Sequence, residues 1–531
     1  MREENKTYFL WLGFLWTCST AIIPLLLYKS LPLLDLPNHM ARHYLMAHGQ
    51  AGPLQQYYAK SEAVFPNSAV DYLWSLFGYP GDVERFSQLT IVFQSVALIV
   101  AIMVLARVMH KSWTFWSLAG GLLVWNLPML NGFQNFTFAL PFAILALALW
   151  IACEHRPVAQ RITLFLPVAF LLMVMHFFAF LAFATCAFGR QAQLLWEARQ
   201  DRKAVFLQSM VLSVVFLMPL AWLMGNISSD PYSVAGHRTE YGDVVERLVI
   251  LLSPVLGAYK DGSTLLLFSG LAAGILLYGS FLTLVTRRTG PRIVLAPVLY
   301  GPVIALALAV LIMPGWLNGI ALAHVRLPVA LLAILIAGSR WEGCSTAHLK
   351  LVAAIVVSLM IVRAIAFAQT ARVHSDEVAQ LRQVLAYLPQ GSRLLPLRAE
   401  GKQSNSRLEH VDAYAIIDRQ SFIPDLFQGT HAITVRDTWL DYTHPYQSAV
   451  DECYVVPQAC PNSMLNAQYI FIHPHRNYVF FEKWPCKFTH VLMYDRSARY
   501  IPNLPFVQHI KSAGRFTLYA VNPKALAWCK N

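Results

Sequence analysis

Long apolar runs separated by short polar segments fill the first 370 residues of the chain. A helix that crosses a bilayer needs roughly 20 apolar residues. Runs of about that length predict nine spans, at residues 8–28, 87–106, 113–128, 136–153, 204–224, 263–286, 292–313, 317–338 and 350–369. The pattern therefore predicts an α-helical polytopic membrane protein.

One further apolar run, residues 163–188, does not suit a single crossing. A single span there would place the basic segment 190–203 on the face opposite to the other basic loops. Because Lys and Arg in short loops favour the cytoplasmic side, we expect two short half-helices that meet near His176. The fold prediction is thus about nine spans plus a re-entrant or split-helix pair.

With this pair, the short basic loops all fall on one face of the membrane. They are residues 107–111, 155–161, 190–203, 287–292 and 340–350. The positive-inside rule then places the N-terminus in the cytoplasm and puts residues 29–86, 225–262 and everything after about 370 outside. We expect a multi-pass protein of the bacterial inner (cytoplasmic) membrane. Its first apolar run is too long for the h-region of a cleaved signal.

Composition agrees with this class, because 56% of residues are hydrophobic and only 13% are charged. An ordinary soluble domain would carry about twice that share of charge. The formal net charge is +12, but the basic residues lie mostly in the short loops between spans. Nucleic-acid binding is therefore not favoured, and membrane lipids are the expected surroundings.

After about residue 370 the sequence becomes mixed and polar, which predicts a separate domain. A helical stretch at 376–387 is followed by short apolar runs at 393–397, 469–473, 490–494 and 516–521, which are typical of strands. We divide the chain into a transmembrane domain, residues 1–370, and an extracytoplasmic α/β or α+β domain, residues 371–531. No P-loop and no glycine-rich dinucleotide fingerprint occurs in the sequence.

Four of the eight cysteines, Cys453, Cys460, Cys486 and Cys529, lie in this predicted outer domain. An even number in an oxidising compartment favours disulfides. Of the three connectivities we favour Cys453 with Cys460 and Cys486 with Cys529. Four buried free thiols are the alternative, and the lack of a Cys-x-x-Cys pair makes a metal site less favoured.

The segment just after the first predicted span carries the strongest candidate chemistry. Asp35 lies two residues before Pro37, so its backbone is constrained near the membrane surface. A carboxylate held there suits a general base for an acceptor hydroxyl, although it could instead cap the helix that follows. His39 and Arg42 come next, and a guanidinium suits a phosphate group.

Polar residues at membrane depth form a second set of candidates, because ionisable groups there are costly and often functional. They are Asn135 in an outer turn, His176, His324 and Arg326. Arg326 lies deep in its predicted span and needs an anionic partner, either a protein carboxylate or a lipid phosphate. His176 has a simpler alternative as a hydrogen-bonded packing residue.

Asp71 is the other acidic candidate in the first outer loop. Residues 64–74 predict a capped amphipathic helix on the membrane interface. In the first turn of that helix Asp71 would be favoured by the helix dipole. It is either such a supporting residue or a second catalytic carboxylate.

Several local elements resemble the GT-C class of integral-membrane glycosyltransferases, in particular bacterial GT-C-like proteins of unassigned substrate. These elements are Asp35-Leu-Pro-Asn-His39, Pro66-Asn-Ser-Ala-Val-Asp71, Asn131-Gly-Phe-Gln-Asn135, His176-Phe-Phe-Ala179 and Arg326-Leu-Pro328. The resemblance implies that Asp35 is the catalytic base and that Arg42, Arg326 or Lys260 contacts a lipid phosphate. The chain lacks the paired-acid motif of better-known members, which leaves Asp71 as the second acid and puts dependence on a divalent metal in doubt.

The resemblance implies an inverting glycosyltransferase that moves a sugar from a polyprenyl-phosphate donor to a glycan, lipid or protein acceptor of the cell envelope. The candidate substrate-binding residues are His39, Arg42, Asn135, His176, Lys260, His324 and Arg326. No cofactor is assigned. Two alternatives stay open: a transporter or flippase whose pathway includes His176, His324 and Arg326, and a non-catalytic envelope assembly protein.

Overall fold

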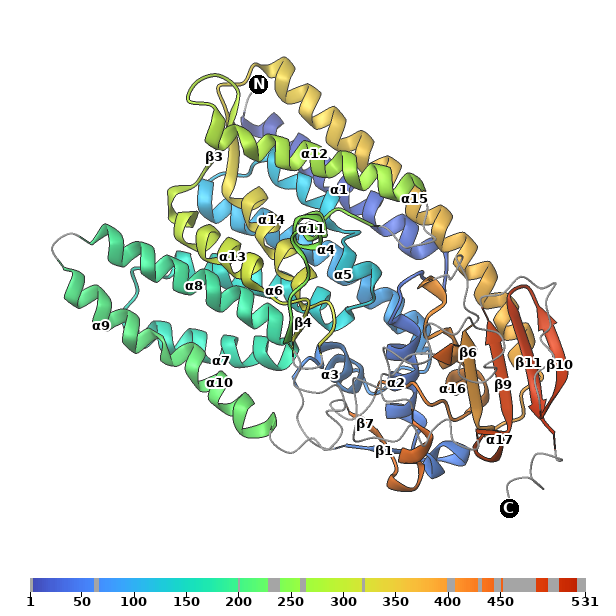
Figure 1. Cartoon of the computed structure of the whole chain (residues 1–531). Coiled ribbons are helices and arrows are strands. Elements are labelled where there is room, and N and C mark those ends of the chain that lie inside the picture. The colour runs from blue at the N-terminus through green and yellow to red at the C-terminus, as the bar shows by residue number, and fades with distance from the viewer. Residues whose placement is uncertain are drawn as a thin grey trace.

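The structure is a computed structural model, and it arranges a large helical body beside a smaller sheet (Figure 1). It describes residues 3–61, 66–198, 201–227, 239–257, 264–317, 320–398, 406–427, 432–443, 450–451, 484–494 and 506–522.

Seven segments of the described chain are long and apolar enough to cross a membrane. They lie in α1 (Glu3–Leu27), α4 (Val83–His110), α6 (Gln134–Ala152), α7 (Val158–Met175), the consecutive α9 (Arg202–Leu212) and α10 (Val214–Ile227), α12 (Thr264–Thr286) and α15 (Thr346–Leu385). The prediction of a polytopic helical membrane protein is confirmed.

The three remaining predicted spans contain apolar helices that are shorter than expected. Residues 113–128 form η2 (Phe115–Leu123) and the start of α5 (Leu127–Leu130). Residues 292–313 form β3 (Arg292–Leu295), η3 (Pro297–Leu299) and α13 (Tyr300–Ile312). Residues 317–338 include the end of β4 (Trp316–Leu317), η4 (Ala323–Val325) and α14 (Leu327–Gly338).

Proline explains much of this shortening. Pro128, Pro297 and Pro328 each lie in the first turn of a helix, where the missing N–H costs nothing. The apolar residues before them therefore stay outside the α-helix. Those before Pro297 form β3, which pairs with β5 (Ser339–Glu342) in antiparallel register.

The chain breaks at His176 as predicted, but the two helices that meet there are long. His176 is extended, with φ −168° and ψ 125°, between α7 and α8 (Phe177–Glu197). These helices have 18 and 21 residues, or about 27 and 32 Å at 1.5 Å per residue. The expectation of two short half-helices is therefore wrong, because both helices continue through polar residues beyond the apolar run.

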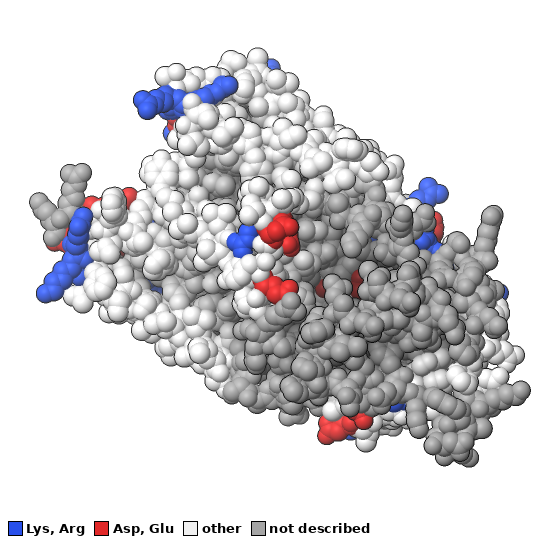
Figure 2. All heavy atoms as spheres, viewed as in Figure 1, with Lys and Arg blue, Asp and Glu red and all other residues white. Residues whose placement is uncertain are grey.

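The longer pair leaves the predicted side of the basic loops unchanged, since two full crossings return the chain to the same face as two half-helices. An ion pair joins the far ends of this region, with Arg190 Nη2 2.7 Å from Glu154 Oε1. Figure 2 shows Lys and Arg gathered where α8 meets α9 and where α12 meets β3, with nearly uncharged helices between.

The C-terminal region forms a five-stranded mixed sheet in the order β10-β11-β9-β6-β8. Its strands are β6 (Leu394–Arg398), β8 (Val450–Asp451), β9 (His490–Tyr494), β10 (Val507–Ala513) and β11 (Phe516–Val521). β6 runs parallel to β8 and β9, whereas β9, β11 and β10 are antiparallel. Three of the predicted strands are confirmed, and the fourth, at 469–473, lies outside the described residues.

One helix joins the two predicted domains. α15 runs without a break through residue 370 to Leu385, and its end packs against β10 and β11. The predicted boundary thus falls inside a helix, and the division at 370 stays a prediction. Cys486 lies in α17 (Trp484–Lys487). Cys453, Cys460 and Cys529 lie outside the described residues, so the disulfide pairings stay a prediction.

The first outer loop lies between the membrane helices and the sheet (Figure 1). Its α2 (Leu36–His48) packs against α16 (Tyr414–Arg419) and η6 (Val411–Ala413). Its β1 (Tyr58–Lys60) pairs with β7 (Ile433–Val435). α3 (Ala69–Leu76) packs against α6 and α7. Short elements complete the description: η1 (Gly52–Gln56), β2 (Thr239–Glu240), α11 (Val244–Ile250), η5 (Ser406–Leu408) and η7 (Asp437–Tyr442).

Candidate active site at the outer end of the first span

The backbone of Asp35 is held against the turn that connects α5 to α6. Leu34 N donates to Leu130 O at 3.0 Å, and Asp35 N donates to Asn131 O at 3.1 Å. Gly132 in this turn has φ +77°, and a Cβ there would lie 2.7 Å from Asp35 N. Only glycine fits this conformation and this contact without strain. The two GT-C-like elements, at residues 35–39 and 131–135, are thus brought together.

The Asp35 side chain is nearly buried, with 13% of its surface exposed. Asp35 stands at the N-cap position of α2, yet within the described chain its carboxyl makes no capping hydrogen bond. Burial, aided by the charge of Glu409, raises the pKa of Asp35 to about 8, while Arg326 and Arg42 act in the opposite direction. The geometry does not support the helix-cap alternative.

Arg42 and Asp71 form a buried ion pair. Arg42 Nε donates to Asp71 Oδ1 and Arg42 Nη2 donates to Asp71 Oδ2, both at 2.9 Å. His43 Nε2 lies 3.0 Å from Asp71 Oδ1. The side chains of Arg42 and His43 are wholly inaccessible, and that of Asp71 is 2% exposed. The guanidinium of Arg42 is therefore already paired with a protein carboxylate.

Asn135 and His176 both hold turns in place. Asn135 Oδ1 accepts from Val70 N at 2.8 Å, and its amide donates to Asn67 O at 2.5 Å. His176 Nδ1 accepts from Phe178 N at 3.1 Å, which caps α8. Asn67, which has φ +60°, accepts from Phe177 N at 2.8 Å. These bonds tie the first outer loop to the α7–α8 turn.

Arg326 is buried at the start of α14 with a guanidinium that lies over two aromatic rings. Its Cζ is 4.2 Å from the ring centre of Phe133 and 4.9 Å from that of Phe178. Nη1 donates to the carbonyls of Ala321 and Leu322 at 3.2 and 3.0 Å. Nε has no hydrogen-bond partner among the described residues. Of the two anionic partners considered for Arg326, a protein carboxylate forms no ion pair with it within the described chain, so a buried donor is left for another acceptor.

The other candidates lie further from this arrangement or outside it. His324 Nε2 is 3.2 Å from Glu246 Oε1 of α11. The ring of His39 packs edge-on against Phe427, with 5.7 Å between ring centres. Lys260 lies outside the described residues. Within the described chain, no group of three or more His, Cys, Asp or Glu is arranged to hold a metal ion.

The C-terminal region contributes residues that the sequence analysis did not single out. His410 Nε2 lies 3.7 Å from Asp35 Oδ1, and His410 Nδ1 lies 3.9 Å from Asp425 Oδ2. Asn38 fastens the same region to α2, because its amide donates to Asp425 O at 2.9 Å and its carbonyl accepts from Phe427 N at 2.7 Å. No motif marks these residues, which come together only through the packing of η6 against α2.

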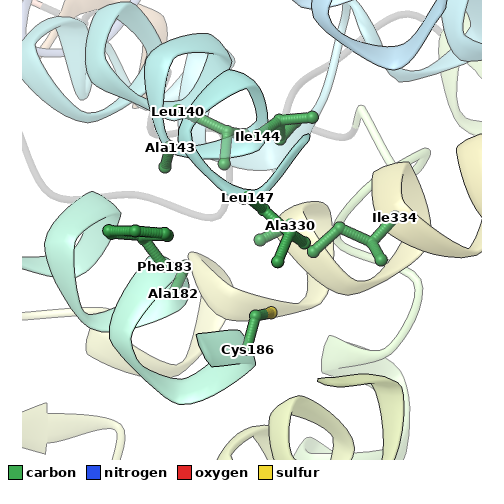
Figure 3. A pocket seen from close by; sticks show the side chains of 9 residues that line it. All are labelled: Leu140, Ala143, Ile144, Leu147, Ala182, Phe183, Cys186, Ala330 and Ile334. Atoms are coloured by element: carbon green, nitrogen blue, oxygen red, sulfur yellow. The ribbon is translucent and has the colours of Figure 1, made fainter. Parts of the chain in front are cut away.

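A separate pocket lies within the helical body, between α6, α8 and α14 (Figure 3). It is lined by Leu140, Ala143, Ile144, Leu147, Ala182, Phe183, Cys186, Ala330 and Ile334. Apart from the Cys186 thiol these side chains are hydrocarbon, so the pocket offers a sugar or phosphate no charged partner. We do not assign it to the candidate site.

Comparison with known proteins gives the fold. No protein-family model and no curated protein sequence matches the chain. Among solved structures, ArnT from Cupriavidus metallidurans in the apo state matches with a TM-score of 0.50 and 12% identity, covering 98% of this chain and 99% of that one. ArnT bound to undecaprenyl phosphate matches with a TM-score of 0.49 and 12% identity, covering 97% and 98%. ArnT is a GT-C glycosyltransferase. The resemblance to the GT-C class is therefore confirmed at the level of the fold, over nearly the whole chain.

Proposed function

We propose that this protein is an inverting GT-C-type glycosyltransferase that moves a sugar from a polyprenyl-phosphate donor to a glycan, lipid or protein acceptor of the cell envelope. The site would lie at the outer face of the bacterial inner membrane, with the N-terminus in the cytoplasm and residues 371–531 outside. Asp35 is the general base. The GT-C-like fold and the seven apolar helices support this class of protein.

One observation carries the assignment of Asp35. Its carboxyl is nearly buried and makes no helix-capping bond within the described chain, yet it lies close enough to Arg326 and Arg42 for their charges to act on it. A base must meet the acceptor hydroxyl while the leaving phosphate meets a cation. A carboxyl that caps no helix and lies near a buried guanidinium supplies both needs in one place.

In the proposed reaction the acceptor oxygen attacks the anomeric carbon of the sugar as its O–H proton passes to Asp35. The bond from the anomeric carbon to the phosphate oxygen breaks, and its electron pair leaves with the polyprenyl phosphate. A single displacement of this kind inverts the anomeric configuration and requires one base. No second carboxylate is obligatory.

The ion pair revises the roles proposed for Arg42 and Asp71. Asp71 is engaged by Arg42 and His43, so we propose that it fixes Arg42 and does not act as a second catalytic acid. Arg42 then contributes charge near Asp35. Contact with the lipid phosphate is assigned to Arg326, whose Nε is buried and without a partner in the described chain.

Binding of undecaprenyl phosphate to the purified full-length protein tests this assignment. Arg326→Lys keeps the positive charge but loses the planar fork, so the phosphate contact should weaken by about 1 to 3 kcal/mol, or roughly 5- to 150-fold in Kd. Arg340→Lys is the matched control, because Arg340 is exposed and paired with Glu342; its Kd should equal that of the wild type. Unchanged binding by a folded Arg326→Lys protein would contradict the phosphate role.

A further inference from the structure

His410 lies between Asp35 and two buried carboxyls of the C-terminal region. Its Nε2 faces Asp35 Oδ1 at 3.7 Å, and its Nδ1 faces Asp425 Oδ2 at 3.9 Å. The His410 side chain is 5% exposed and that of Asp425 is inaccessible. Hydrogen bonds between catalytic groups are often this long before substrate binds. A continuous row of titratable groups thus leads from Asp35 into the outer region.

Asp412 and Asp425 form a buried pair of carboxyls. Both residues are fully buried, and their carboxyls lie close enough for each to affect the pKa of the other. None of their four carboxyl oxygens has a hydrogen-bond partner among the described residues. Burial raises the pKa of both carboxyls, and that of Asp425 well above its usual range. A protonated Asp425 carboxyl can donate to an acceptor such as His410 Nδ1.

The backbone of His410 has a strained conformation, which indicates that surrounding contacts hold this residue in place. It has φ +62° and ψ 6°, a left-handed conformation that is uncommon for histidine and persists where surrounding contacts enforce it. Asn38 lies 3.4 Å from Nδ1, and Phe427 packs edge-on at 4.9 Å between ring centres. The imidazole is thereby directed along the row between Asp35 and Asp425.

Other charged groups near His410 and Asp35 raise and lower the pKa values of these two residues. Glu409 and Asp425 favour the imidazolium form of His410, whereas Arg398 and, above all, burial lower the pKa of His410. Around Asp35, Glu409 opposes ionisation while Arg326 and Arg42 favour it. Arg398 is itself paired with Glu409 at 2.8 Å. A hydrogen bond from a nearby donor to the carboxylate favours ionisation of a carboxyl this buried.

We propose that a neutral His410, which accepts at Nδ1 from the Asp425 carboxyl, donates from Nε2 to Asp35 and so stabilises the carboxylate that takes the acceptor proton. His410 is then a positioning residue that acts through Asp35, and its imidazole stays neutral because burial lowers its pKa. This inference rests on the proposed function, in which Asp35 is the base. As in a catalytic triad, a carboxyl group orients the imidazole on one side while the imidazole acts on the catalytic group on its other side.

Labelling of Asp35 with dicyclohexylcarbodiimide, which reacts with protonated carboxyls in apolar surroundings, tests the inference without donor or acceptor. Full-length protein in detergent is labelled between pH 5 and 9.5, and peptide mass spectrometry quantifies the adduct. We expect His410→Asn to raise the midpoint pH for loss of labelling by about one unit, the scale of a lost hydrogen bond to the ionised carboxyl. Asparagine tolerates the left-handed backbone, so the variant should fold.

Asp425→Asn is the second variant, and it should raise the midpoint in the same direction by a smaller amount. His490→Gln, on β9 next to Thr489, is the control with an unchanged midpoint. Equal midpoints in the wild type and both variants, or no labelling of wild-type Asp35 at any pH, would overturn the proposal. Failure of the proposed function would appear separately, as absent binding of undecaprenyl phosphate with the labelling shift intact.

Discussion

At the scale of single residues, the sequence identified Asp35 but not the surroundings that give it its properties. The turn at Asn131 and Gly132 holds its backbone, and His410, from a region more than 370 positions away, lies beside its carboxyl. Burial therefore decides its protonation, and burial depends on long-range packing. The same holds for Arg326, whose depth was predicted but whose aromatic partners Phe133 and Phe178 were not.

The pH dependence of transfer follows from this burial. The base works only when ionised, so the rate should rise as pH rises through the pKa of Asp35. Burial raises that pKa to about 8, which sets the midpoint of the rise, and a hydrogen bond from His410 moves this midpoint lower. Folding stability changes in the opposite sense, because the folded chain keeps a proton that the unfolded chain releases between about pH 4 and 8. A midpoint near pH 4 would contradict the buried environment.

At the scale of elements, apolar periodicity predicted six of the seven long apolar segments and three strands closely. It failed where proline starts a helix late, as at Pro297, and where polar helix ends extend past an apolar run, as at α8. Strand pairing between β1 and β7 could not be predicted, because neither segment has a strong pattern and the pairing joins distant parts of the chain.

Topology is the direct test of the α7–α8 pair. A reporter active only outside the cytoplasm should be active when fused after Gly78 or Gly391 and silent when fused after Ala198, because two crossings return the chain to the side of the N-terminus. Activity at Ala198 would mean that only one of the two helices crosses. That result would also reverse the expected side of every later segment.

At the scale of the whole molecule, an ionic cluster joins the membrane helices to the outer region. Arg382 near the end of α15 contacts Glu84 at the start of α4 and lies 3.1 Å from Asp418 of α16. Glu84 has only 7% of its side chain exposed. These bonds fix α16 and η6, and therefore His410, relative to α2 and Asp35. The predicted domains thus share one site at their junction.

Removal of the arginine should loosen this junction. Arg382→Ala leaves the buried Glu84 with only the longer contact to Lys29 Nζ at 3.8 Å, which should lower the free energy of unfolding by about 2 kcal/mol, less than for a wholly buried pair because Arg382 is partly exposed. Arg340→Ala breaks the exposed pair with Glu342 and should cost about 1 kcal/mol at most. Thermal unfolding in detergent compares the two. Equal thermal midpoints of the Arg382→Ala and Arg340→Ala variants would show that the ionic cluster does not hold the membrane helices and the outer region together.

The measurement that tests the central claim most directly is sugar transfer by the Asp35→Asn variant. Asparagine has nearly the same shape and caps helices about as well as aspartate, but it cannot accept the proton of a hydroxyl. We expect the purified variant to unfold at the wild-type temperature and to bind undecaprenyl phosphate as the wild type does, while transfer from a polyprenyl-phosphate sugar falls by about a hundredfold or more. Transfer at the wild-type rate by this variant would contradict the assignment of Asp35 as the base.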